Sequence, residues 1–238
     1  MFDEIKPHIA ELQKRLIFCV LALIAGFLIC FGFWEIILDF MTSPLKDTLP
    51  EGSNIVFIKV QEAFLTAVKV SFFAGFLLVL PFILYQIWSF VAPGLYDNEK
   101  KLVLPFVLFA SFMFLLGAAF CYFLVVPLAF AFLVNFGSEL FAAMPSIEEY
   151  VSLFIKLVLA FGVAYELPVF IFFLAKLGLV TDKSLKKHFR VAILLLFIFA
   201  AIMTPPDVLS QFLMAVPLIG LYALSILIAK WVNPEVQE

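Results

Sequence analysis

The sequence predicts an all-α integral membrane protein with six transmembrane helices, from its composition and from the spacing of its apolar runs. Hydrophobic residues make up 65% of the 238 residues and charged residues only 14%, whereas soluble domains contain about 45–50% apolar and about 25% charged residues. A soluble fold of this length cannot bury so much apolar surface, so the excess must face lipid. We expect the whole chain, residues 1–238, to form a single membrane domain.

Each span needs about 20 helical residues to cross the hydrocarbon layer. The spans are predicted at residues 16–38, 70–91, 102–127, 152–177, 191–204 and 209–229. Pro81 lies inside the second span, Pro127 is expected to mark the far end of the third, and Glu166 interrupts the fourth.

The last two spans are predicted to form a hairpin whose turn is Thr204-Pro205-Pro206-Asp207. Two adjacent prolines remove two N–H donors, and one long helix would place Asp207 in the middle of the bilayer. The fifth helix then has about 14 residues and a length of roughly 21 Å, against a hydrocarbon core of about 30 Å. The fifth span is therefore predicted to be short, and the sixth is also expected to be short.

The distribution of Lys and Arg predicts the orientation, because cytoplasmic loops carry an excess of both. One set of loops holds Lys6, Lys14, Arg15, Lys100, Lys101, Lys176, Lys183, Lys186, Lys187, Arg190 and Lys230. The opposite set holds only Lys46, Lys59, Lys69 and Lys156. Both termini are predicted to lie in the cytoplasm. The far-side loops, around residues 39–62 and 138–150, are expected to cap the helix ends.

The residues that membrane enzymes use for catalysis do not occur in the expected pattern. The histidines, His8 and His188, both lie in cytoplasmic segments, and the sequence contains no HExxH motif and no P-loop. The three cysteines lie in apolar runs and form no CxxC pair. We expect no enzymatic activity, no catalytic residue, no cofactor and no metal site. The net charge of −3 also gives no indication of a nucleic-acid partner.

Three acidic residues occupy positions that suggest function. Glu166 lies near the middle of the fourth span, where a carboxylate costs about 2.5 kcal/mol or more on insertion scales. It is either a protonated Glu that bonds a neighbouring helix or carbonyls freed by Pro168, or a functional residue. Glu11 precedes the first span, and Glu99 lies in the link between spans two and three. Composition alone favours structural roles for both: an i,i+4 pair of Glu11 with Arg15, and a favourable helix-dipole position for Glu99.

Five motifs distributed over nearly the whole chain resemble the TatC family of twin-arginine protein export. They are residues 8–16, similar to HLxELRxRL; residues 90–101, similar to a FxxPGLxxxEKR-type loop; the FGxxxExP pattern at 161–168; the TPPDxxSQ turn at 204–211; and Ser43-Pro44-Leu45. Gln13 departs from the pattern, because the family usually has arginine at that position.

The resemblance implies a receptor that binds twin-arginine signal peptides of folded precursors at the cytoplasmic face of the prokaryotic inner membrane. It implies a translocase with TatA, TatB and other TatC copies, driven by the proton-motive force. The implied peptide-binding residues are Glu11, Glu99, Phe90, Pro93, Leu95 and Arg15. Glu166 and Gln211 are the implied intramembrane residues for partner contact. Pro44, Pro205, Pro206 and Asp207 are implied to shape the periplasmic cap, either as rigid turns or as partner contacts.

Two other function classes remain as alternatives at this point. A proton-coupled secondary transporter could use Glu166 as its proton carrier, but such proteins usually contain an internal repeat and broken helices, and no repeat is found. A membrane scaffold without a recognition role would give no function to the cytoplasmic Glu motifs.

Overall fold

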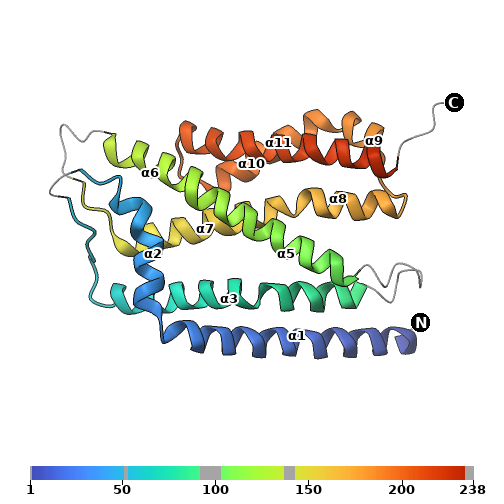
Figure 1. Ribbon diagram of the computed structural model, residues 1–238, viewed down its shortest axis with the longest axis horizontal. Coiled ribbons are helices and arrows are strands. Elements are labelled where there is room, and N and C mark those ends of the chain that lie inside the picture. The colour runs from blue at the N-terminus through green and yellow to red at the C-terminus, as the bar shows by residue number, and fades with distance from the viewer. Residues whose placement is uncertain (1, 51–52, 92–102, 137–142, 234–238) are drawn as a thin grey trace. The chain divides into compact units, whose positions relative to one another are not determined.

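The computed structural model describes residues 2–50, 53–91, 103–136 and 143–233, and these residues are almost entirely helical (Figure 1). Five helical segments of the described chain are long and apolar enough to span a membrane, and a shorter apolar helix covers Phe189–Met203. This confirms the all-α membrane fold with six spans. The described chain separates into two compact units. Whether they form one domain stays a prediction.

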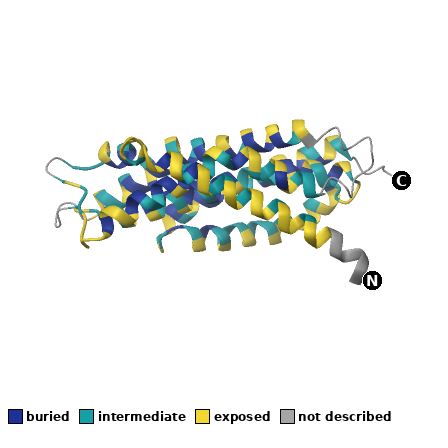
Figure 2. Cartoon of the chain, turned by 90° about the horizontal axis from the view of Figure 1, so that it is seen from below, coloured by how far each residue is buried: buried dark blue, intermediate teal, exposed yellow. Residues whose placement is uncertain are grey.

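The first unit consists of Met1–Ser43, Ile55–Phe112 and Ser146–Val151. Helices α1 (Phe2–Phe31) and α3 (Glu62–Val91) run side by side in opposite directions (Figure 1). They approach closely at two glycines, since a Cβ on Gly75 would lie 2.6 Å from the Phe27 nitrogen, and a Cβ on Gly26 would lie 2.9 Å from the Gly75 carbonyl oxygen. Any larger residue there would force the helices apart. Exposed and half-buried residues dominate the remaining surface of α1 (Figure 2).

The first span ends earlier than predicted. Residues 16–38 were expected as one helix, but α1 ends at Phe31 and helix α2 (Trp34–Lys46) starts in a new direction (Figure 1). The N–H groups of Gly32 and Phe33 bond to carbonyls three residues back, on Ile29 and Cys30. Such tightening is common at helix ends, and glycine stabilises a helix less than alanine by about 1 kcal/mol.

A buried carboxylate joins two segments of the first unit that are far apart in sequence. Glu62 begins α3, eight residues before the predicted start at residue 70, and it is 1% exposed. Its Oε2 accepts the backbone N–H groups of Ile58 at 2.7 Å and Lys59 at 3.1 Å. Its Oε1 accepts the Ser146 hydroxyl and the Glu148 N–H. The loop before α3 and the start of α7 (Ile147–Tyr165) are thereby held on one side chain.

Two further interactions stabilise the same part of the first unit. Lys69 on α3 forms an ion pair with Glu148 on α7 at 2.8 Å. The hydroxyl of Tyr150, which is 2% exposed, donates to the Met41 carbonyl on α2 at 2.6 Å. Three helices of this unit are therefore connected by side chains at one end.

The third span continues beyond the residue predicted to end it. It consists of α5 (Val103–Phe120), a π-helical turn η2 (Cys121–Val125) and α6 (Val126–Asn135), and so extends past the predicted limit at residue 127. The Val126 N–H bonds to the Cys121 carbonyl, five residues back. Prolines and π-turns are both known causes of helix distortion, and here the wider turn directly precedes Pro127 and the helix continues.

The second unit consists of Pro44–Asn54, Met113–Pro145 and Ser152–Glu238. Its helices include most of α7, then α8 (Leu167–Lys176), α9 (Asp182–Lys187), α10 (Phe189–Met203) and α11 (Val208–Val232). The fifth span is short as predicted, because the 15 residues of α10 extend only about 22 Å. The sixth span is not short, because α11 has 25 residues and continues three residues beyond the predicted end at residue 229.

Replacing Glu62 by Gln is expected to destabilise the protein. One carboxylate oxygen becomes an NH2 group, and the N–H or O–H groups that donate to that oxygen lose their acceptor. Leaving buried donors unpaired costs about 1–3 kcal/mol each, so the apparent melting temperature in detergent should fall by several degrees. Glu149→Gln changes an exposed acid in the same region and should leave the melting temperature unchanged. Equal melting temperatures for both variants would contradict a stabilising role for Glu62.

Candidate functional site

Glu11 and Arg15 form an ion pair on the first unit, near the start of the first span. The Arg15 Nη2 lies 2.6 Å and its Nε 3.0 Å from the same carboxylate oxygen, Glu11 Oε1. The Glu11 side chain is 37% exposed and the Arg15 side chain 21% exposed. The i,i+4 pair predicted from the sequence is therefore present, and it leaves the acid at the surface.

Gln86 on α3 also contacts this pair, and the sequence analysis did not identify it. Its Oε1 accepts Arg15 Nη1 at 3.2 Å, and the residue is 9% exposed. Gln13, which stands where the family pattern has arginine, is exposed on α1. A guanidinium therefore neighbours Glu11 in spite of this departure, and it belongs to Arg15. A polar residue in an otherwise apolar span was the signal that could have directed attention to Gln86.

The other predicted peptide-binding residues lie mostly outside the part of the chain that the structure describes. Glu99, Pro93 and Leu95 fall within residues 92–102 and are not described. Phe90 is half-buried at the penultimate position of α3, directly before this segment.

Glu166 lies at a one-residue break in the fourth span, which was predicted over residues 152–177 with Glu166 interrupting it. Helix α7 ends at Tyr165, α8 begins at Leu167, and Glu166 is the residue between them. Pro168, near the start of α8, has no N–H to continue the helical ladder. The Glu166 Oε1 is buried and has no hydrogen-bond partner among the described residues. A buried carboxyl oxygen without a partner is costly, which is why this residue is a candidate for contact with another molecule.

Close helix packing explains the glycine that precedes Glu166 in the FGxxxExP pattern. A Cβ on Gly162 would lie 2.5 Å from the Phe114 ring on α5, and a Cβ on Gly117 would lie 2.7 Å from the Phe161 carbonyl oxygen. The Phe120 ring also packs against Phe161, with centroids 5.7 Å apart. Helices α5 and α7 therefore pack closely against each other one turn away from Glu166.

The turn between the last two spans contains the predicted residues Pro205, Pro206 and Asp207. Helix α10 ends at Met203 and α11 begins at Val208, so the hairpin turn lies where it was predicted. Asp207 caps α11, because its Oδ1 accepts the Ser210 N–H at 2.6 Å. Its Oδ2 is buried without a partner among the described residues.

Gln211, predicted together with Glu166 as an intramembrane contact residue, joins the two helices of this hairpin. Its Nε2 donates to the Phe197 carbonyl on α10 at 3.2 Å. No hydrogen bond between Gln211 and Glu166 is found among the described residues. In the same unit, Lys156 Nζ on α7 donates to the Ile202 carbonyl at the end of α10 at 2.5 Å, a favourable position for a cation.

Pro44 was predicted in a far-side loop and instead lies within a helix. It is buried in the last turn of α2 (Trp34–Lys46). A proline this close to a helix end interrupts few hydrogen bonds. The helical position corrects the prediction that Ser43-Pro44-Leu45 forms part of a loop.

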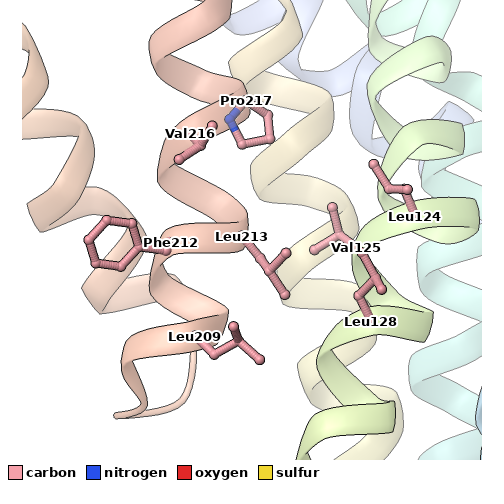
Figure 3. Close-up of a pocket in the computed structure, with 8 residues that line it drawn as sticks. All are labelled: Leu124, Val125, Leu128, Leu209, Phe212, Leu213, Val216 and Pro217. Carbon is pink, nitrogen blue, oxygen red and sulfur yellow. The ribbon is translucent and has the colours of Figure 1, made fainter.

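An apolar hollow of about 290 Å³ lies between η2 and α6 on one side and α11 on the other (Figure 3). Leu213 and Val125 face each other across it. Its lining side chains are all apolar: Leu124, Val125, Leu128, Leu209, Phe212, Leu213, Val216 and Pro217. The hollow therefore suits an apolar chain or helix face. Within the described residues, no group of three or more His, Cys, Asp or Glu is arranged to hold a metal ion.

The chain is similar to a known protein family over nearly its whole length. The family described as Sec-independent protein translocase protein (TatC) matches residues 7–217. The chain is 58% identical to the Sec-independent protein translocase protein TatC of Campylobacter jejuni, covering 100% of this chain and 98% of that protein. It is 54% identical to the TatC protein of Helicobacter pylori, covering 100% of this chain and 92% of that protein.

The fold is similar to solved structures as well. A crystal structure of the twin arginine translocase receptor TatC matches with a TM-score of 0.85 at 36% sequence identity, covering 94% of this chain and 99% of that chain. A second structure of the same receptor, in the detergent DDM, matches with a TM-score of 0.86 at 37% identity.

Replacing Gly162 by Ala is expected to destabilise the helix contact beside Glu166, because the new methyl group would overlap the Phe114 ring. Overpacking of this kind costs about 1–3 kcal/mol, which should lower the apparent melting temperature. Combining it with Phe114→Leu should recover more than half of the loss. Gly220→Ala is the matched control, because a Cβ there meets no atom within 4 Å. Equal effects of Gly162→Ala with and without Phe114→Leu would contradict this packing.

Proposed function

The chain belongs to the TatC family of Sec-independent protein translocases, and on that premise we propose that it binds signal peptides with consecutive arginines and passes folded precursor proteins to an export assembly. It is a component of a protein translocase and not an enzyme. The transporter and scaffold alternatives are no longer favoured. Membership of the family explains why the N-terminal motif, the loop motif and Glu166 occur together in one chain.

The observation that carries the proposal is the partly exposed carboxylate of Glu11. Arg15 fixes the orientation of this carboxylate, and the Glu11 side chain, which is 37% exposed, is accessible to a ligand. A planar guanidinium can place two N–H groups on a carboxylate at once, as Arg15 does on one oxygen of Glu11, and an ammonium cannot reproduce this planar contact. Glu11 is therefore suited to distinguish arginine from lysine.

A second carboxylate from another segment completes the proposed site. Successive side chains of an extended peptide point to opposite faces, so two consecutive arginines need acids from two different segments. Glu99 is the proposed second acid and the more important of the two. Phe90, Pro93 and Leu95 are the proposed residues around it that hold the rest of the peptide.

We place the protein in the prokaryotic inner membrane with both termini in the cytoplasm. The excess of Lys and Arg in one set of loops supports this orientation. The peptide site around Glu11 then faces the cytoplasm, where precursors fold before export. The cap residues Pro44, Pro205, Pro206 and Asp207 lie on the periplasmic side in this arrangement.

TatA and TatB, together with further copies of this chain, are the proposed protein partners. The Oε1 of Glu166 has no hydrogen-bond partner in the part of the chain that the structure describes, which supports a contact with a polar group on a partner helix. Gln211 and the apolar hollow beside it on α11 are proposed to extend this contact. The short α10 supports local thinning of the bilayer at this position. The proton-motive force is the proposed energy source.

Replacing Glu99 or Glu11 by Gln is expected to reduce binding of a twin-arginine signal peptide, because the neutral amide loses the charge-assisted bond. Such bonds contribute about 1.5–3 kcal/mol, so the Kd should rise at least tenfold, and more for Glu99→Gln. Glu4→Gln neutralises an acid earlier on α1 and serves as the control. Export of a twin-arginine substrate that continues unchanged after Glu99→Lys would contradict the proposed site.

Replacing Glu166 by Ala is expected to reduce translocation strongly while leaving signal-peptide binding within about twofold, since the residue is proposed to act at partner contact. Export rate in membrane vesicles and peptide affinity of the purified protein are the two measurements. A variant that loses peptide binding but still assembles with TatA and TatB would contradict this order of events.

A further inference from the structure

Gln86 stands out because it is a buried amide in the apolar helix α3. The residue is 9% exposed, and its Oε1 accepts the Nη1–H of Arg15 at 3.2 Å. A buried amide oxygen needs a donor, and a guanidinium in a partly apolar site is stabilised by an acceptor on each side. The two residues therefore stabilise each other.

The close glycine contact fixes the helix register that brings these two residues together. Arg15 lies eleven residues before Gly26 on α1, and Gln86 lies eleven residues after Gly75 on the antiparallel α3. Eleven residues correspond to about three helical turns and about 16 Å on each helix. Arg15 and Gln86 therefore lie on the same contact face, at the same level. Their juxtaposition follows from the packing of the two spans.

Arg15 binds Glu11 in a one-sided way that differs from the usual pairing. Arginine and carboxylate commonly form two parallel bonds, one to each oxygen. Here Nε and Nη2 of Arg15 both donate to Oε1 of Glu11, while Nη1 is directed to Gln86. A carboxylate can accept about four hydrogen bonds, and no described residue donates to Glu11 Oε2. One oxygen of this partly exposed acid is thus occupied, and the other has no donor among the described residues.

We propose that Gln86 is a positioning residue for peptide recognition: it holds the Arg15 guanidinium on one oxygen of Glu11 and so keeps the second oxygen free for an arginine of the ligand. Without Gln86, the Arg15 guanidinium is free to rotate and to bond both oxygens of Glu11. It then competes with the ligand's guanidinium for the second oxygen. This inference rests on the proposed binding role of Glu11 and adds a residue that does not touch the ligand.

The test measures binding of a fluorescent twin-arginine signal peptide, and of its twin-lysine version, to the full-length protein in nanodiscs. Gln86→Met keeps the length of the side chain but removes the acceptor, and the Kd for the twin-arginine peptide should rise about tenfold. Gln86→Glu keeps an acceptor toward Arg15 and should restore near wild-type affinity. Gln61→Met, the same change at an exposed glutamine, should have no effect.

A double-mutant cycle separates positioning from a general loss of structure. If Gln86 acts by restraining Arg15, then Gln86→Met should have no further effect in an Arg15→Gln protein. Additive losses in the cycle, or equal affinities of Gln86→Met and wild type, would overturn the proposal. Should Gln86→Met fail to fold, Gln86→Asn shortens the reach and keeps the polarity, and it should give the same loss of affinity. Wild-type affinity in a folded Gln86→Asn protein would then overturn the proposal.

The outcomes also separate this inference from the proposed function. If Glu11→Gln removes the preference for arginine and Gln86→Met does not, only the positioning role is wrong. If the wild-type protein shows no preference for arginine over lysine, the proposed receptor function is wrong, and the positioning role with it.

Discussion

Buried and partly buried polar side chains need partners inside the protein, because water does not reach all of their donors and acceptors. Glu62 satisfies this constraint with three backbone N–H groups and the Ser146 hydroxyl. Arg15 satisfies it by lying between Gln86 and Glu11. Each of these sets joins segments that are distant in sequence. The helices of the first unit are therefore connected at the points where the chain places polar groups among apolar ones.

The same constraint makes Glu166 a candidate for partner contact. Its Oε1 is buried and has no bond to a described residue, at a helix break beside the tightly packed Gly162 and Phe114. Glu62 shows that this fold can satisfy a buried carboxylate completely. We therefore propose that the Glu166 oxygen without a partner among the described residues meets a polar group of another chain during assembly.

The sequence predicted the features that depend on local chemistry. The apolar runs located the spans, the double proline located the last hairpin, and the spacing of Glu11 and Arg15 predicted their ion pair. It did not predict the bonds of Glu62 or Gln86, because these depend on which helices pack together and in what register. Helix continuity was misjudged at Gly32 and Pro127, since a glycine or proline can end a helix, bend it or lie in a helix that continues through a wider turn.

We propose that the chain distinguishes arginine from lysine through carboxylates at its cytoplasmic face. The most direct measurement compares the affinities of the wild-type protein in nanodiscs for a twin-arginine signal peptide and for the same peptide with two lysines. Both peptides carry the same charge, so a preference must come from the geometry of the guanidinium. We expect the twin-arginine peptide to bind at least tenfold more tightly. Equal affinities in a folded protein would contradict the account.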